Sequence, residues 1–241
     1  LYSSAASDVY KRQAQAFDIL WCKLPLPPFW PRPGHAELHA TDAGVILCFP
    51  SYDGTLQLGW AVAKGRYKEL KDQGVDAWLV ELVRHVRADL AAHIRANADR
   101  VRNPFVLDVV CDRLIKWTAP GLLLIGDAAH PMSPVGGQGV NVALRDALCA
   151  ANELVPVLRE DGSPAEIDAA AARVQALRMD EVIAIQNIQT RQSGLMLQQG
   201  WYAKVMTLLI PLAARLAKLR GQGVRGERRF AKHLRPLTLA V

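Results

Sequence analysis

Strand-like patterns dominate the first third of the chain. Residues 17–24 (FDILWCKL) are apolar and rich in strand-forming side chains, and a proline-rich run ends this segment as a loop. Residues 44–49 and 55–62 are two further strand-like runs. Asp53-Gly54 lies between them, and this dipeptide is the strongest short signal for a β-hairpin. The pattern therefore predicts a strand followed by a hairpin.

Helical spacing begins after the hairpin. Seven apolar residues fall on one stripe of a single predicted helix over residues 75–98, namely Trp78, Leu79, Leu82, Val83, Val86, Leu90 and Ile94. Residues 105–110 return to a strand pattern. Residues 121–125 (GLLLI) are wholly apolar, which is typical of a strand that is buried on both faces.

The last part of the chain is predicted to be helical. Residues 139–159 form a helix whose apolar stripe includes Val140, Ala143, Leu144, Ala147 and Leu158. A capping box with proline at the first helical position, Ser163-Pro164-Ala165-Glu166, starts another helix that runs to about residue 189. Residues 201–219 are a further helical segment. This order of elements predicts an α/β or layered α+β fold.

Charge is concentrated near the end of the chain. The formal net charge is +6, and residues 215–235 hold eight basic residues against one acid. Such a tail can bind an anionic partner, but we interpret it as a solvated end and expect no nucleic-acid binding. Phe230 is the only aromatic residue in this tail, whereas proteins that bind single-stranded nucleic acid use several aromatic side chains for stacking on the bases.

The four cysteines have no metal-ligand or redox spacing, so we expect buried free thiols, no metal site and a cytoplasmic protein. No secretory signal opens the chain. Residues 205–214 are its longest apolar-leaning stretch, about half of what a membrane span needs, so we expect no stable span.

The segment 126–141 (GDAAHPMSPVGGQGVN) carries the candidate chemistry. A glycine and Asp127 directly follow the predicted buried strand, at the end where ligands bind in open α/β sheets. Glycines then lead into a helix start, whose unpaired N–H groups and positive dipole favour an anion or an electron-rich oxygen. The loop can therefore hold a ligand with hydroxyl groups at one end and developing negative charge at the other.

Other polar residues in this region have plainer interpretations. His130 has no second histidine or cysteine at metal-ligand spacing, so we interpret it as a structural loop residue. We expect Arg145 and Asp146 to form an ion pair or a solvated helix face without a chemical role.

The same segment resembles the second flavin motif of the para-hydroxybenzoate hydroxylase-type FAD monooxygenases, with about ten identities in sixteen positions. The resemblance implies that Asp127, after Gly126 and before Ala128, binds a ribityl hydroxyl. It places Pro134 near the isoalloxazine ring. It implies that Gly139, Val140 and Asn141 direct N–H groups at the N1–C2=O edge of the ring, where reduced flavin carries negative charge. Gly136, Gly137 and Gln138, which lead into this helix start, are implied to bind the cofactor as well.

A weaker resemblance over residues 17–191 implies the layout of this family. Residues 14–110 would be a substrate-domain sheet and helix, residues 111–192 the FAD-contacting strand, loop and helices, and residues 193–241 a helical segment with a basic tail. The family's G-x-G-x-x-G motif and central Asp-Gly motif are absent. Residues 1–13 (LYSSAASDVYKRQ) show no periodicity, and we interpret them as a non-native leader that replaces upstream sequence. The expected fold is a truncated FAD/NAD(P)-binding, Rossmann-like fold without its N-terminal βαβ unit.

The function that the resemblance implies is NAD(P)H- and O2-dependent hydroxylation of an aromatic or apolar small molecule, with FAD as cofactor and no assigned catalytic residue. Tyr52 and Trp60 on the hairpin are candidates for the wall of a substrate chamber, although Trp60 is also a plausible core residue. Two alternatives remain: a flavin-dependent reductase or halogenase of the same fold, and a non-catalytic fragment with a basic interaction tail. The oligomeric state is open.

Overall fold

The computed structural model describes residues 10–13, 15–41, 44–72, 75–196 and 237–240. The chain divides into two compact units: one built on residues 16–109, and one built on residues 110–192 together with the strand at residues 10–13. The predicted helix over residues 201–219 and the basic tail lie outside the described residues. No helix that the structure describes is long and apolar enough to cross a membrane.

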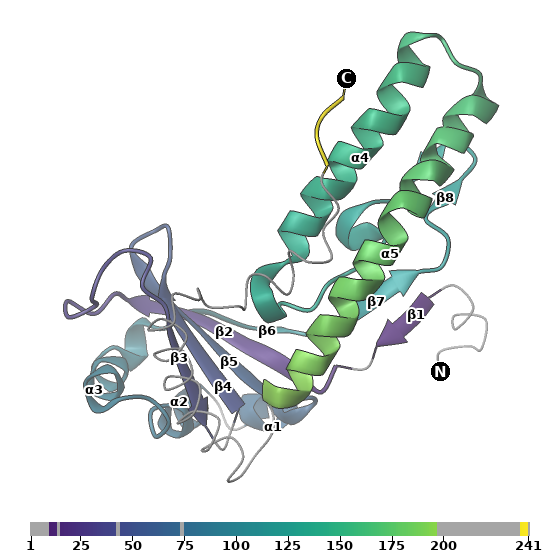
Figure 1. Ribbon diagram of the computed structural model, residues 1–241. Coiled ribbons are helices and arrows are strands. Elements are labelled where there is room, and N and C mark those ends of the chain that lie inside the picture. Colours follow the sequence, from purple (N-terminus) through teal and green to yellow (C-terminus); the bar gives the residue numbers. More distant parts are fainter. Residues whose placement is uncertain (1–9, 14, 42–43, 73–74, 197–236, 241) are drawn as a thin grey trace, which may run out of the picture. The chain divides into compact units, whose positions relative to one another are not determined.

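The first unit is built on a five-stranded antiparallel sheet (Figure 1). Its strands lie in the order β3-β4-β5-β2-β6, with bounds Phe17–Pro25 for β2, Glu37–Thr41 for β3, Gly44–Pro50 for β4, Thr55–Ala63 for β5 and Arg102–Leu107 for β6. The predicted hairpin is confirmed as β4 and β5. Its turn is closed by the Ser51 N–H donating to the Thr55 carbonyl at 2.7 Å, and Gly54 supplies a φ of 74°.

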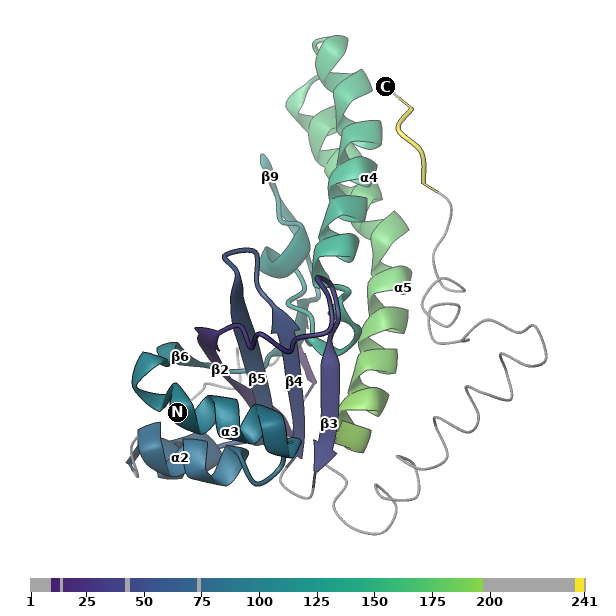
Figure 2. The same cartoon turned by 90° about the vertical axis from the view of Figure 1, so that its left-hand side faces the viewer.

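Three short helices accompany this sheet: α1 (Arg66–Asp72), α2 (Val75–Leu82) and α3 (Ala88–Ala96). The prediction of one helix over residues 75–98 is wrong, because the backbone turns after α2 and Arg87 is extended. The predicted stripe still faces the sheet: Trp78 and Leu82 from α2 and Leu90 from α3 belong to one core cluster. Two short helices, which lie side by side in Figure 2, therefore cover one face of the sheet.

The core of the first unit lies between this sheet face and the helices. Alternate residues of β2, β4 and β5 point into it, and Trp60 is completely buried there.

All four cysteines are free and buried, as expected. Burial raises the pKa of the Cys22 thiol to about 12, so that thiol is unreactive at neutral pH.

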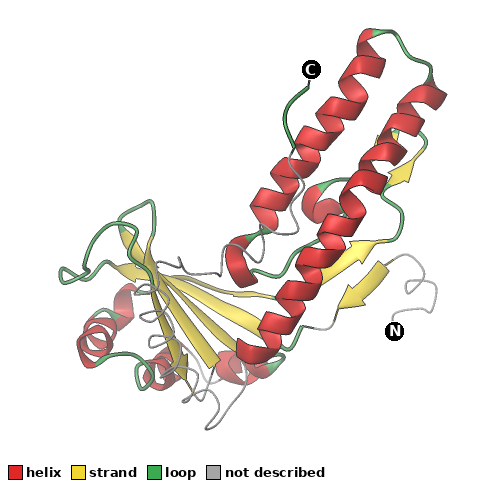
Figure 3. Ribbon diagram, viewed as in Figure 1, coloured by secondary structure: helices red, strands yellow, loops and turns green. Residues whose placement is uncertain are grey.

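The second unit is built mainly on two long helices, α4 (Gly139–Arg159) and α5 (Pro164–Met196), which lie side by side (Figure 3). The bounds of α4 and the start of α5 are as predicted. The capping box is confirmed, with the Ser163 hydroxyl donating to Glu166 Oε2 at 2.8 Å and the Glu166 N–H donating back to the Ser163 hydroxyl at 3.4 Å.

The strands of the second unit differ from prediction. β1 (Tyr10–Gln13) pairs with β7 (Cys111–Leu114), although residues 1–13 show no strand periodicity in the sequence. The apolar run 121–125 is not a strand buried on both faces. It contributes only β9 (Leu122–Leu123), which pairs on one side with β8 (Thr118–Ala119), and no other described strand pairs with it.

The buried face of α4 is also not the predicted apolar stripe. Val140 and Leu144 are 73% and 64% exposed, whereas Val142, Asp146 and Cys149 are buried. This inward face, with a carboxylate at its centre, leads directly to the candidate site.

Candidate functional site

The first part of the site is a single 3₁₀ turn over Gly126–Ala128, directly after the extended residue Ile125. Gly126 has a φ of 58°, in the left-handed region that favours glycine, and a Cβ there would lie 3.1 Å from the Ala143 Cβ on α4. The turn therefore packs closely on the N-terminal half of α4. Asp127 is exposed and has no hydrogen bond or ion pair with any described residue.

The second part is the glycine-rich entry to α4. Gly136 and Gly137 both have positive φ, 77° and 61°, and the Gly137 N–H donates to the Pro134 carbonyl at 3.0 Å. The Gln138 side chain does not cap the helix, because it turns back and donates to the Gly136 carbonyl at 2.8 Å. The first helical hydrogen bond comes from Val142.

The amides of residues 139, 140 and 141 consequently have no acceptor among the described residues. Open amides at the positive end of a 21-residue helix are suited to an electron-rich oxygen. The exposed Asp127 carboxylate, an acceptor without a protein donor, is suited to a hydroxyl group. These features fit the ring-and-ribityl part of a flavin, which presents both kinds of group.

A buried charge network lies beneath the turn. The Asp146 carboxylate is completely buried on α4, with His130 Nε2 at 2.6 Å and Arg178 Nε at 2.8 Å. Arg178, on α5, also donates to Glu181 at 2.9 Å. Arg145 completes the chain with two hydrogen bonds to Glu181, at 2.6 and 2.8 Å. Acids and arginines alternate, so each buried charge has an opposite partner.

This network keeps its acids ionised. Burial opposes ionisation of Asp146, but hydrogen bonds from His130 and Arg178 outweigh it and hold the pKa of the Asp146 carboxyl below its usual value. Burial likewise opposes ionisation of Glu181. The hydrogen bonds from its two arginine partners outweigh that effect and lower the Glu181 pKa to about 2.

The loop between the turn and α4 is also held by α5. The Gln189 side chain donates to the carbonyls of Ser133 and Val135, at 2.8 and 3.0 Å. The Trp117 ring packs at 4.9 Å from the His130 ring. His130 is therefore a buried loop residue, as the sequence suggests, and it supports the site from below.

Asp146, Arg178 and Glu181 are the residues that sequence reasoning missed. The expected Arg145–Asp146 pair does not form: Arg145 binds Glu181, and Asp146 is buried rather than solvated. A signal was present, because Asp146 lies four residues after Val142 and therefore on the same helix face. An acid among buried apolar positions needs a buried partner.

The two hairpin candidates have opposite environments. Tyr52 is 98% exposed at the tip, where Lys23 Nζ lies 4.9 Å from the centre of its ring. Trp60 is 0% exposed in the core between the sheet and the helices. Trp60 is therefore a core residue, and its ring has no exposed surface with which to contact a substrate.

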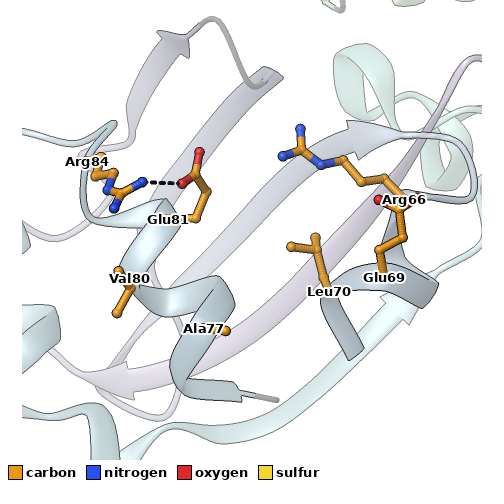
Figure 4. Close-up of a pocket in the computed structure, with 7 residues that line it drawn as sticks. All are labelled: Arg66, Glu69, Leu70, Ala77, Val80, Glu81 and Arg84. Atoms are coloured by element: carbon orange, nitrogen blue, oxygen red, sulfur yellow. Dashed lines mark hydrogen bonds and ion pairs between the residues drawn. The ribbon is translucent and has the colours of Figure 1, made fainter. Parts of the chain in front are cut away.

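A separate cavity of about 460 Å³ lies in the first unit between α1 and α2 (Figure 4). Its lining includes Arg66, Leu70 and Val80, together with Glu81 and Arg84, which are paired at 2.9 Å. It contains none of the residues that the sequence singles out, and we assign it no role.

Comparison with known proteins bears on this geometry. The model of a family described as FAD binding domain matches residues 9–182. The chain is 33% identical over 200 residues to a 6-methylpretetramide 4-monooxygenase of Streptomyces rimosus, covering 83% of this chain and 45% of that protein. It is 30% identical over 108 residues to a 3-demethoxyubiquinol 3-hydroxylase of Escherichia coli, covering 44% and 26%. The chain thus spans under half the length of these relatives.

Solved structures share the fold. The structure of Pseudomonas aeruginosa PqsL in complex with 2-aminobenzoylacetate matches with a TM-score of 0.62 at 22% identity, covering 82% of this chain and 53% of that one. The flavin-dependent halogenase CmlS matches with a TM-score of 0.59 at 19% identity, covering 76% and 33%. The mixed α/β architecture is therefore one that flavin-dependent enzymes use.

Proposed function

This chain belongs to the FAD binding domain family, and from that premise we propose that it supplies the flavin-ring site and the substrate domain of an FAD-dependent aromatic monooxygenase. Two relatives are named as a monooxygenase and a hydroxylase, and both names indicate insertion of oxygen into a small molecule. The observation that carries the proposal is that one segment offers both an Asp127 carboxylate without a described donor and the open amides that start α4.

Each part of the site has a proposed task. Asp127 accepts a hydrogen bond from a ribityl hydroxyl, and the amides of Gly139, Val140 and Asn141 face the N1–C2=O edge of the ring. The positive φ values at Gly136 and Gly137 place the backbone where no side chain intervenes. Pro134 stiffens the loop beside the ring. When bound, FAD supplies the redox chemistry, with NAD(P)H as reductant and O2 as co-substrate.

An aromatic pair on the sheet of the first unit supports the proposal that the substrate is aromatic or apolar. Trp21 and Phe49 alternate with the core residues Cys22 and Cys48, so their side chains point to the sheet face opposite the core. Their rings are 6.0 Å apart in an edge-to-face arrangement. An aromatic pair of this kind favours contact with a flat apolar molecule.

Flavin binding to the 241-residue chain tests the proposal. Riboflavin probes the ring-and-ribityl site without the ADP group, and quenching of its fluorescence measures the Kd. A hydrogen bond to a charged group contributes about 1.5–3 kcal/mol, so Asp127→Ala should raise the Kd roughly ten- to hundredfold. Asp180→Ala removes an exposed acid of α5 as a matched control and should leave the Kd unchanged. An unquenched signal, or equal Kd values for Asp127→Ala and the unaltered chain, would refute the assignment.

Product analysis then separates the chemistries of this fold. With NAD(P)H, O2 and an aromatic substrate, a monooxygenase adds one oxygen atom to the product. A product that instead gains a halogen when halide is supplied would favour the halogenase alternative.

A further inference from the structure

Three segments far apart in the sequence meet at the Asp146 carboxylate. Oδ2 accepts hydrogen bonds from the Gly126 N–H at 3.0 Å and from His130 Nε2 at 2.6 Å. Oδ1 accepts from Arg178 Nε at 2.8 Å. An ionised carboxylate only accepts hydrogen bonds, so the imidazole nitrogen facing it is the donor. None of these three side chains has more than 2% of its surface exposed.

The Asp146 carboxylate holds both ends of the segment Gly126–His130, which contains the 3₁₀ turn and is called the flavin turn below. Gly126 begins the turn and is bound through its amide, whereas His130 follows the turn and is bound through its side chain. The turn is also closed on itself, because the Gly126 carbonyl accepts from the amides of Ala129 and His130, at 2.9 and 2.8 Å. Asp127 lies between the two held ends and is exposed.

Gly126 would otherwise be free to leave this conformation, since a glycine with positive φ has many alternatives in an open loop. Asp146 can hold Gly126 in this conformation without occupying the flavin site, because the Asp146 side chain is completely buried. A ligand-binding carboxylate that is fixed in advance binds more tightly than one that has to be ordered on binding.

We propose that Asp146 and His130 are positioning residues that hold the Gly126–His130 turn in its flavin-binding conformation before flavin arrives. The proposal rests on the proposed function for the identity of the ligand. Arg178 anchors the carboxylate from the other side, so the turn is fixed by a bridge that extends through α4 to α5.

Hydrogen–deuterium exchange of the 241-residue chain without flavin provides the first test. Asp146→Asn keeps the side-chain shape but leaves one acceptor oxygen, and its NH2 group then faces a donor. His130→Leu removes the donor that holds the far end of the turn, fills similar space and leaves the Asp146–Arg178 pair intact, so it remains informative if Asp146→Asn fails to fold. In His130→Leu, amide exchange over residues 126–130 should rise about tenfold or more, whereas exchange in β4 and β5 should be unchanged.

A matched control separates positioning from general helix packing. Glu153 on α4 and Arg173 on α5 form an ion pair at 2.7 Å that joins the same two helices away from the turn. Glu153→Gln should leave exchange over residues 126–130 unchanged. Equal acceleration in Glu153→Gln, or unchanged exchange in His130→Leu, would overturn the proposal whether or not riboflavin binds.

Riboflavin affinity provides the second test. His130→Leu should weaken riboflavin binding about tenfold in the otherwise unaltered chain. In an Asp127→Ala background its effect should vanish, because the turn then has no carboxylate to position. Full additivity of the two changes would overturn the positioning role. Lack of riboflavin binding in the unaltered chain would refute the proposed function, and the exchange result would still decide whether Asp146 and His130 hold the turn.

Discussion

The close contact of the 3₁₀ turn over Gly126–Ala128 with α4 predicts a large cost for Gly126→Ala. Gly126 has a φ of 58°, and an alanine in the left-handed region costs about 1–2 kcal/mol. The new Cβ would also lie 3.1 Å from the Ala143 Cβ, closer than ordinary van der Waals contact. Overpacking of this kind adds about 1–3 kcal/mol. The expected loss in free energy of unfolding is therefore about 2–5 kcal/mol.

Gly121→Ala isolates the backbone part of this loss. Gly121 lies in the same unit with a φ of 71°, and a Cβ there meets no atom within 4 Å. Its expected cost is the backbone contribution alone, about 1–2 kcal/mol. Urea denaturation followed by circular dichroism, with amide exchange at Leu114 as a local probe, measures both variants. The Leu114 N–H donates to the Ala129 carbonyl at 2.8 Å and so reports opening beside the turn.

A double-mutant cycle with Ala143→Gly completes the argument. Removing the Ala143 methyl group should recover the steric part of the Gly126→Ala loss, apart from about 1 kcal/mol for glycine in a helix. If Gly126→Ala costs no more than Gly121→Ala, or if Ala143→Gly recovers nothing, the turn does not pack on α4 as described.

Three further predictions follow from other contacts. The Glu181 pKa of about 2 lies below its ordinary 4.5, so its contribution to stability, about 3 kcal/mol, is present above pH 4.5 and lost as the pH falls towards 2. In urea titrations between pH 6 and 3, Glu181→Gln should be less stable at pH 6 but lose less on acidification; parallel curves would contradict this. Gly59→Ala should destabilise the first unit by about 1–3 kcal/mol, because its Cβ would lie 2.5 Å from the Trp21 ring, and Trp21→Leu should relieve that loss in urea denaturation. Trp60→Ala should cost about 3–5 kcal/mol in the same assay, whereas Tyr52→Ala should change stability by less than about 0.5 kcal/mol.

Local signals in the sequence were sufficient for several elements. Asp53-Gly54 predicts its hairpin correctly because the turn conformation is a property of those residues. The capping box at Ser163 marks the start of α5 for the same reason. The segment 126–141 has the local backbone that its sequence predicts, a turn after an extended residue and glycines before a helix, while its role as a flavin site stays a prediction.

Other features required tertiary information. Periodicity shows which residues of α4 share a face, but it does not show which face is covered, so the predicted stripe through Val140 and Leu144 is exposed. The apolar run 121–125 has the composition of a buried strand, but a strand is buried only where neighbours pair on both sides.

The sequence by itself determined the local chemistry of this protein: a carboxylate at Asp127, a glycine-rich helix start and the helices that flank them. Only the tertiary structure decided what holds them. The partner of Asp146 is an arginine on α5, 32 residues later. No local pattern encodes that distance, because burial removes water as a partner and leaves each charge to pair with whichever opposite charge the fold brings near it.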